Sequence, residues 1–245
     1  MAVEIYRASL TLMEHTFFAT REVGILYETE PLIGNYALAY ALGLCNAPYH
    51  WAGPPRYKID LGPLNEQGLY VTPGTFVAET LRYAFNQFNA QTDTYYSRFD
   101  QNAIGTSPTK KARAANFPQS GKIRMLGRES QAYFFLLNLQ GIALRLPNYI
   151  RLGKFNSKAR LEWERLFLES EQPEESEQVL DFMLNAADLP SRFVTKMRAF
   201  SIFNISPAPL LSHCHLEGDF WHCKSRTGKQ IFLPADMRFG VDVIE

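Results

Sequence analysis

The sequence has few cysteines and no excess of charge of either sign. Its 245 residues include three cysteines, Cys45, Cys214 and Cys223. Such a sparse, odd set argues against a disulfide framework and for a reducing compartment. Lysine and arginine together number 25 and so do aspartate and glutamate, so the molecule as a whole is not a binder of polyanions. Any contact with nucleic acid must come from positive side chains that are gathered locally.

Long apolar runs and common catalytic motifs are also missing. No stretch reaches the roughly 20 apolar residues of a membrane span, and the first residues, MAVEIYRASL, lack a signal-peptide pattern. There is no Walker loop, GxSxG, HExxH or dinucleotide fingerprint. We therefore expect a cytoplasmic binding protein with no catalytic residues, no metal site and no cofactor.

The first 44 residues predict a strand followed by a buried helix. From Val3 to Met13 apolar residues alternate with Arg7, Ser9 and Thr11, which is typical of a half-buried strand. Thr29-Glu30-Pro31 resembles a helix start, and Leu32–Leu44 is apolar almost all round. Because such a helix needs cover on several sides, the rest of the chain should pack around it.

Further along, the pattern predicts mostly strands. The proline-rich stretch 45–64 indicates a loop or extended chain, and the acidic run 169–177 indicates a solvated linker or the start of a helix. A polyanion would be repelled by that run, so it should face away from any nucleic acid. We expect strands at 68–71, 76–88, 132–139 and 142–146, a helix at 179–187, and a hairpin turn at 225–228 between 220–223 and 230–233.

Positive charge is concentrated in two segments. The first, 92–127, is long, polar and broken by glycine, serine and proline, which fits either an ordered projecting hairpin or a mobile loop. Its positive residues include Lys110, Lys111, Arg113, Lys122 and Arg124.

The second positive segment, 151–160, is built around Gly153 and Phe155. Arg151, Lys154 and Lys158 could meet phosphates, Phe155 offers a stacking plane, and a glycine lets the backbone approach a ligand. The alternative is an exposed basic turn without a ligand.

Two further groups of residues allow other chemistry. His213-Cys214-His215 and His222-Cys223 carry zinc-ligand types, but their spacing matches no common zinc pattern, and packed core residues are the simpler interpretation. His15, just after the first strand, could act as a general base for RNA cleavage, although it has no evident catalytic partner.

Three segments resemble the start of a CRISPR-associated family. They are Tyr6–Leu12, Thr16–Glu22 and Thr29–Leu38, and 151–160 resembles that family's second basic segment. The family is the Cas-five-like (Csc-one) subunit of type I-D Cascade surveillance complexes, within the RAMP superfamily. The likeness is specific in the first 45 residues and looser in the acidic run and the C-terminal third.

The resemblance implies an α+β fold. The expected parts are a ferredoxin-like (RRM-like) domain at 1–170, with a thumb hairpin inserted at about 92–127, and a smaller β-rich region at 171–245. It also implies a non-catalytic subunit that binds the five-prime handle of the CRISPR RNA and bridges a Cas-seven-like backbone subunit to the Cas-ten-like large subunit. Target DNA would be met only indirectly, through the complex.

Single-stranded RNA would then be held by positive side chains at phosphates and by aromatic rings at bases. Phe17 and Arg21, in the loop after the first strand, would add to the two positive segments. The hypothesis requires a continuous positive surface between those segments. Its rivals are a metal-independent endonuclease that processes CRISPR RNA and a zinc-stabilised interaction module without RNA.

Overall fold

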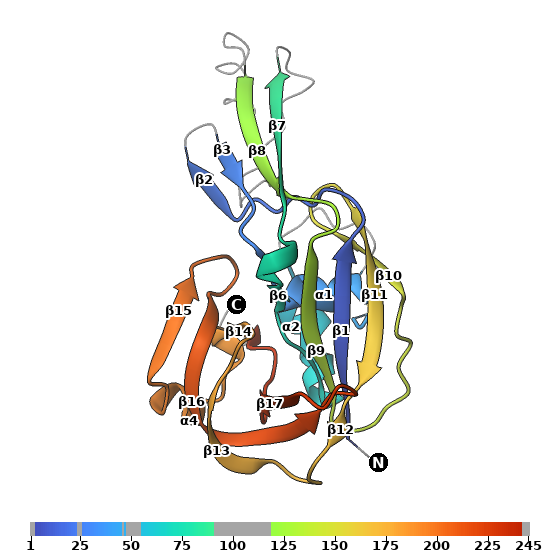
Figure 1. Ribbon diagram of the computed structural model, residues 1–245, viewed down its shortest axis with the longest axis vertical. Coiled ribbons are helices and arrows are strands. Elements are labelled where there is room, and N and C mark those ends of the chain that lie inside the picture. Colours follow the sequence, from blue (N-terminus) through green and yellow to red (C-terminus); the bar gives the residue numbers. More distant parts are fainter. Residues whose placement is uncertain (1–2, 24–25, 46, 48–54, 91–118, 242–245) are drawn as a thin grey trace.

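The computed structural model describes residues 3–23, 26–45, 47, 55–90 and 119–241. Strands dominate and helices are few, so the expectation of a mixed α+β fold is confirmed at that level. The strands form three sheets, which we call sheet A, the arm sheet and sheet C (Figure 1).

Sheet A has the order β10-β11-β1-β9-β6-β4, with β5 also pairing with β9. The predicted first strand is β1, and its alternation is confirmed, because Ala8, Leu10 and Leu12 are fully buried while Ser9 is exposed. β9 is the predicted strand buried on both faces. The bounds are β1 Glu4–Leu12, β4 Leu32–Ile33, β5 Leu69–Val71, β6 Gly74–Phe76, β9 Gln131–Asn138, β10 Tyr149–Leu152 and β11 Ser157–Arg165.

Helices α1 (Asn35–Ala41) and α2 (Tyr57–Glu66) lie along one face of sheet A (Figure 1). The helix expected from Leu32 begins later, because Leu32 pairs with Thr75 as part of β4. Thr29 is not a helix cap: its hydroxyl donates to the Phe18 carbonyl at 2.8 Å and accepts from the Phe18 amide at 3.1 Å. The apparent helix start is therefore a contact with the loop after β1.

Two other local predictions in this half are wrong. The proline-rich stretch contains α2 even though Pro63 lies inside it, since Leu61 and Leu64 are buried in the core. Residues 142–146 form no strand; Ile142 instead exchanges hydrogen bonds with the Asn138 side chain. The apolar alternation there reflects packing onto the core rather than pairing.

The arm sheet projects away from the rest of the molecule (Figure 1). Its order is β2-β3-β8-β7, in which β3 and β8 run parallel and the other pairs are antiparallel. The strand favoured at 76–88 is confirmed from Tyr83 onward, while a 3-10 turn occupies Ala78–Thr80. The bounds are β2 Arg21–Val23, β3 Leu26–Glu28, β7 Tyr83–Ala90 and β8 Gln119–Leu126.

In sheet C every strand pairs with the long β16. The predicted turn at 225–228 connects β16 and β17, as expected. The acidic run is not a linker: Glu174–Val179 is β13, paired with β16. The helix expected at 179–187 is also wrong, because this stretch holds the end of β13, β14 and a 3-10 turn at Ala186–Asp188. The bounds are β12 Phe167–Leu168, β13 Glu174–Val179, β14 Leu184–Asn185, β15 Ala199–Phe203, β16 Leu210–Lys224 and β17 Gln230–Pro234.

A buried carboxylate joins the C-terminal part of the chain, from residue 171 onward, to α1 and sheet A. Asp188, 3% exposed, accepts hydrogen bonds from Asn35 (2.6 Å), Tyr36 (2.9 Å), Tyr70 (2.9 Å) and the Gly240 amide (2.7 Å). Burial raises the pKa of Asp188 to about 6, against the effect of these donors. One side chain therefore connects α1, β5 and the chain near its C-terminal end.

Candidate nucleic-acid interface

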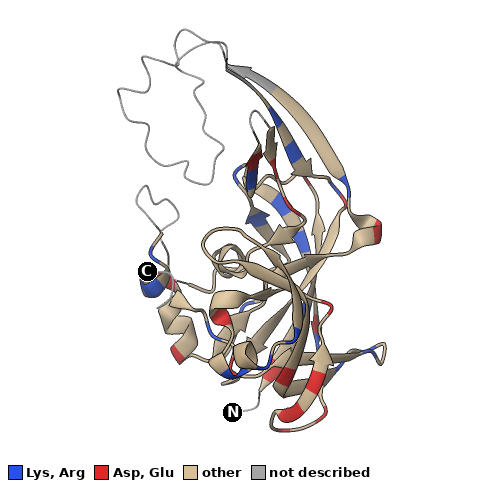
Figure 2. Ribbon diagram, turned by 90° about the vertical axis from the view of Figure 1, so that its left-hand side faces the viewer, with Lys and Arg blue, Asp and Glu red and all other residues tan. Residues whose placement is uncertain are grey.

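One face of the arm sheet carries three of the predicted positive side chains. β8 pairs Lys122 with Leu26 and Arg124 with Glu28, while β2 pairs Arg21 with Glu28. Paired residues share a face of a sheet, so Arg21, Lys122 and Arg124 lie on the same side. We call this side the arm face. Blue bands on the strands of the arm mark lysine and arginine residues (Figure 2).

Two aromatic residues of β7 complete the arm face. Phe85 pairs with Arg124 and Tyr83 with Leu126, so both rings project on this side. Phe85 is 70% exposed and Tyr83 40% exposed. The alternation of Tyr83 and Phe85 is visible in the sequence, but their place beside Lys122 and Arg124 depends on strand register, and the sequence-based set of contact residues omitted them.

The three positive side chains of the arm face differ in how exposed they are and in how closely they pair with acidic residues. Arg124 pairs with Glu28 at 3.2 Å and lies over the Tyr83 ring at 4.8 Å, so it holds the sheet together. Burial raises the pKa of Tyr83, and the Arg124 charge opposes that rise. Arg21 is 62% exposed and lies 3.9 Å from Glu30, and Lys122 is exposed. Arg21 and Lys122 are thus the more accessible cations of this face.

The opposite face of the arm sheet is apolar and covered. Ile123 and Met125 pack there with Phe17, which is fully buried. The Phe155 ring stacks on Phe17 with centroids 5.4 Å apart, and Phe155 remains 48% exposed. In this arrangement Phe17 offers no open ring face to a base and supports Phe155 instead.

Gly153 brings the β10–β11 turn against the loop after β1. Its φ is +70°, and a Cβ atom there would lie 2.5 Å from the Phe17 carbonyl oxygen. The next amide, that of Lys154, donates to the same oxygen at 2.8 Å. The close approach that requires glycine is therefore made to the chain itself, whereas the sequence suggested a ligand.

The positive side chains of this turn lie at the surface. Arg151, 62% exposed, lies 3.5 Å from Glu14 and donates to the Asn156 carbonyl at 3.0 Å. The Lys158 ammonium lies over the Tyr149 ring at 4.2 Å, and Lys154 is exposed. They form a basic turn with Phe155 at its centre, as predicted from the sequence.

The two positive groups do not share one surface among the described residues. Lys122 and Arg124 project from the arm face, whereas Phe155 and its turn cover the opposite face through Phe17. The required continuous positive surface is therefore not seen. Lys110, Lys111 and Arg113 lie outside the described residues.

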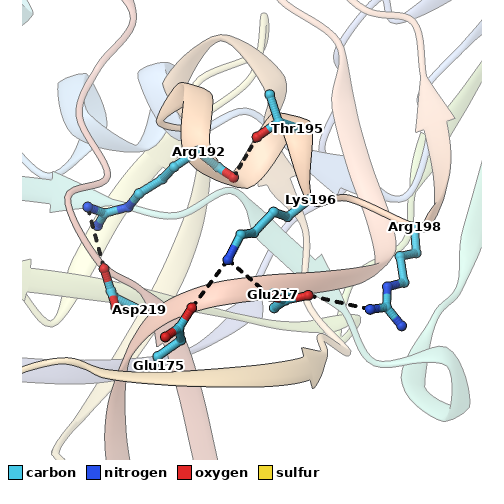
Figure 3. A network of polar contacts seen from close by, with 7 residues as sticks. All are labelled: Glu175, Arg192, Thr195, Lys196, Arg198, Glu217 and Asp219. Carbon is cyan, nitrogen blue, oxygen red and sulfur yellow. Dashed lines mark hydrogen bonds and ion pairs between the residues drawn. The ribbon is translucent and has the colours of Figure 1, made fainter.

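Several positive side chains of the C-terminal part are paired with acids. Lys196 contacts Glu175 at 3.2 Å and Glu217 at 3.0 Å, and Arg198 contacts Glu217 at 3.4 Å (Figure 3). Hydrogen bonding from Lys196 lowers the pKa of Glu217. The acidic residues of sheet C lie at the end of the molecule away from the arm (Figures 1 and 2), where they would not oppose RNA on the arm face.

His15 is exposed, and its Nδ1 accepts a hydrogen bond from the Arg128 amide at 3.2 Å. In neutral His15 the proton then sits on Nε2, so neither ring nitrogen is a free base. Among the described residues, no tyrosine hydroxyl and no lysine ammonium makes a hydrogen bond to the His15 ring.

The histidine and cysteine cluster is dispersed along β16. Cys214 and Cys223 are buried and burial raises the pKa of both thiols, while His215 pairs with Glu177 at 2.8 Å. Across the part of the chain that the structure describes, no group of three or more His, Cys, Asp or Glu residues is placed to hold a metal ion. Nor does any described helix combine the length and apolar character of a membrane span.

The fold and these surfaces define a strand-rich α+β protein that carries positive side chains on a projecting sheet and on a separate hairpin turn. The chain belongs to the family of type I-D CRISPR-associated proteins Cas5/Csc1, which matches residues 3–242. The resemblance stated from the sequence is thus confirmed, and it gives the chain a role in a type I-D CRISPR system.

A similar solved structure is a chain from the cryo-EM structure of the type III-B Cmr-beta bound to cognate target RNA and AMPPnP, state 1. It is 9% identical, 86% of each chain is covered, and the TM-score is 0.48. Among curated proteins, none matches the sequence.

Proposed function

We propose that this chain is a non-catalytic subunit of a type I-D Cascade complex that binds the five-prime handle of the CRISPR RNA. Family membership supports the setting. The observation that supports RNA contact is the arm face, where exposed Arg21 and Lys122 lie beside the exposed Phe85 ring.

This combination suits single-stranded RNA. Arg21 and Lys122 attract phosphates, and Phe85 offers a ring face on which a splayed base can stack. Arg124 keeps Tyr83 in place beside them. RNA on the arm face reaches Arg151, Lys154 or Lys158 only by passing round the sheet, so the proposal depends on the arm face alone.

The finer architecture belongs to the same proposal. The order β11-β1-β9-β5 supports a ferredoxin-like sheet, in which an irregular stretch and β10 would replace the second helix. The β7–β8 hairpin would be the thumb. In the complex, the chain would bridge a Cas-seven-like backbone subunit to the Cas-ten-like large subunit.

Paired substitutions on two surfaces test RNA binding. Arg21→Gln with Lys122→Gln removes two charges from the arm face, and Arg192→Gln with Lys224→Gln removes two exposed charges elsewhere. Loss of two phosphate contacts should lower the salt slope of RNA binding by about 1.4. The measurement is fluorescence anisotropy with repeat-derived RNA at several salt concentrations. Equal slopes for both double variants would refute the arm face as the RNA site.

We also propose that the chain does not cleave RNA. Repeat RNA incubated with the purified wild type, without added metal, should remain intact. Cleavage that disappears in His15→Ala would favour the endonuclease instead, despite the hydrogen bond that His15 accepts from Arg128.

A further inference from the structure

A cavity of about 290 Å³ lies between sheet A and the C-terminal part. One wall comes from β1 and β9, through Arg7 and Tyr133, and the other from residues 178–182 and the β16–β17 hairpin. In Figure 1 this hairpin lies beside the lower ends of β1 and β9. The cavity thus exists only because segments far apart in the sequence meet. It uses the polar face of β1, opposite α1 and α2.

Aromatic rings line the cavity, and neighbouring rings meet edge to face rather than in one plane. The Arg7 guanidinium lies over the Tyr133 ring at 5.1 Å, and Tyr133 and Phe135 have centroids 5.9 Å apart. Phe182 packs on Phe135 at 5.0 Å, and the half-buried Phe232 lines the other side. Rings and a guanidinium plane together are what single-stranded RNA bases stack on.

Two positive side chains stand at the cavity and remain partly open to water. The Arg7 side chain is 36% exposed. Its ion pair with Glu164 is long, at 4.0 Å. Lys229 is 66% exposed and lies 2.8 Å from Asp181. Exposed pairs of this kind contribute little, so an incoming phosphate can compete for both cations.

The walls are held in place before any ligand arrives. The Tyr133 hydroxyl donates to the Asp181 carbonyl at 3.0 Å, which connects β9 to the opposite wall. The Lys229 amide donates to the Ser225 hydroxyl at 3.0 Å, and the Arg226 amide donates to Glu164 of β11. A preformed site avoids much of the ordering cost of binding.

We infer that this cavity holds one nucleotide of single-stranded RNA, with the base against Tyr133 and Phe232 and a phosphate at Arg7 and Lys229. Its volume is near the lower end of the roughly 300–1,000 Å³ of small-molecule sites, which suits a single nucleotide better than a folded peptide. The inference deepens the proposed RNA function and rests on it, but it uses none of the arm-face residues.

Matched single substitutions test the cavity in the full-length chain. Val179, 68% exposed, lines the cavity, while Val194, 54% exposed, does not. Val179→Glu and Val194→Glu change the net charge equally, but only the first adds a carboxylate to the lining of the cavity, where it would repel a phosphate. Lys229→Gln and Lys224→Gln form a second pair on the same hairpin. Thermal melts check that all four variants fold.

The probes are fluorescein-labelled oligo-A, oligo-C and oligo-U, measured by anisotropy. Val179→Glu and Lys229→Gln should each weaken binding about tenfold, the scale of one stacked nucleotide, while the control variants bind as the wild type does. Unchanged binding in Val179→Glu and Lys229→Gln, with weaker binding in Arg21→Gln/Lys122→Gln, would overturn the cavity and leave the arm face standing. A wild type that binds no RNA would refute both proposals, and binding of free mononucleotides alone would overturn the assignment to RNA.

Discussion

Replacing Asp188 by alanine should destabilise the fold more than any exposed charge substitution. The change leaves four donors without their acceptor, namely the hydroxyls of Tyr36 and Tyr70, the Asn35 amide and the Gly240 amide. At about 1.5 kcal/mol for each hydrogen bond to a charged group, the loss is about 6 kcal/mol.

Part of that loss is returned, because the buried carboxylate is itself costly when ionised. Burial raises the pKa of Asp188 from 3.8 to about 6, and about two pKa units correspond to about 3 kcal/mol. This cost is what remains after the donors have already offset part of it, so about 6 kcal/mol is an upper bound and we expect a net loss of about 3 kcal/mol or more at pH 7. For a chain of this length we expect the Tm to fall by about 6–12 °C.

Urea unfolding followed by circular dichroism, with a thermal melt, measures both quantities. Asp181→Ala is the control, since Asp181 is 63% exposed and its pair with Lys229 should contribute less than about 1 kcal/mol. If Asp188→Ala unfolds within 1 kcal/mol of Asp181→Ala, at an unchanged m-value, the four hydrogen bonds do not hold the C-terminal part as argued.

Two further predictions follow from contacts of the described residues, and a third follows from the basic insertion seen in the sequence. Because the folded pKa of Asp188 is raised, its contribution to stability is full below about pH 4 and is lost as the pH rises through about 6; the free energy of unfolding of Asp188→Asn should lack this decline of about 3 kcal/mol. Gly153→Ala should destabilise by about 2 kcal/mol or more, because it adds a clash with Phe17 to the strain of positive φ, whereas Gly228→Ala, at φ +84° with open space around it, should cost about 1 kcal/mol; urea unfolding compares them, and equal losses would contradict the Phe17 contact. Loading of CRISPR RNA into a coexpressed complex, measured by RNA recovery, should fall in a triple alanine variant of the basic insertion, at Lys110, Lys111 and Arg113, and normal loading would count against that segment.

Local sequence patterns predicted the secondary structure correctly where it depends on neighbouring residues along the chain. The alternation through β1, the apolar run of β9 and the turn at 225–228 all predicted the observed elements. Side chains in a strand alternate between two faces, so a strand with one buried face shows alternating apolar and polar residues in the sequence. The family resemblance was likewise readable from the first 45 residues.

The predictions of secondary structure were wrong where pairing with a distant strand decides the conformation. Leu32 and Ile33 look helical but pair with β6, and the acidic run became β13 because β16 offered it a partner. Tertiary pairing overrides local propensity in such segments, and strand propensity depends strongly on context. The local sequence of these segments does not predict which strands they pair with.

The order of residues was enough to show that positive charge is gathered in two segments and that the chain belongs to the type I-D Cas5/Csc1 family. The fold was needed to show that Lys122 and Arg124 lie on the side of the arm sheet opposite to Phe155 and its turn, that Gly153 approaches Phe17, and that β1, β9 and the β16–β17 hairpin line a cavity. The reason is register and packing: which face a side chain takes in a sheet depends on strands that lie far away in the chain.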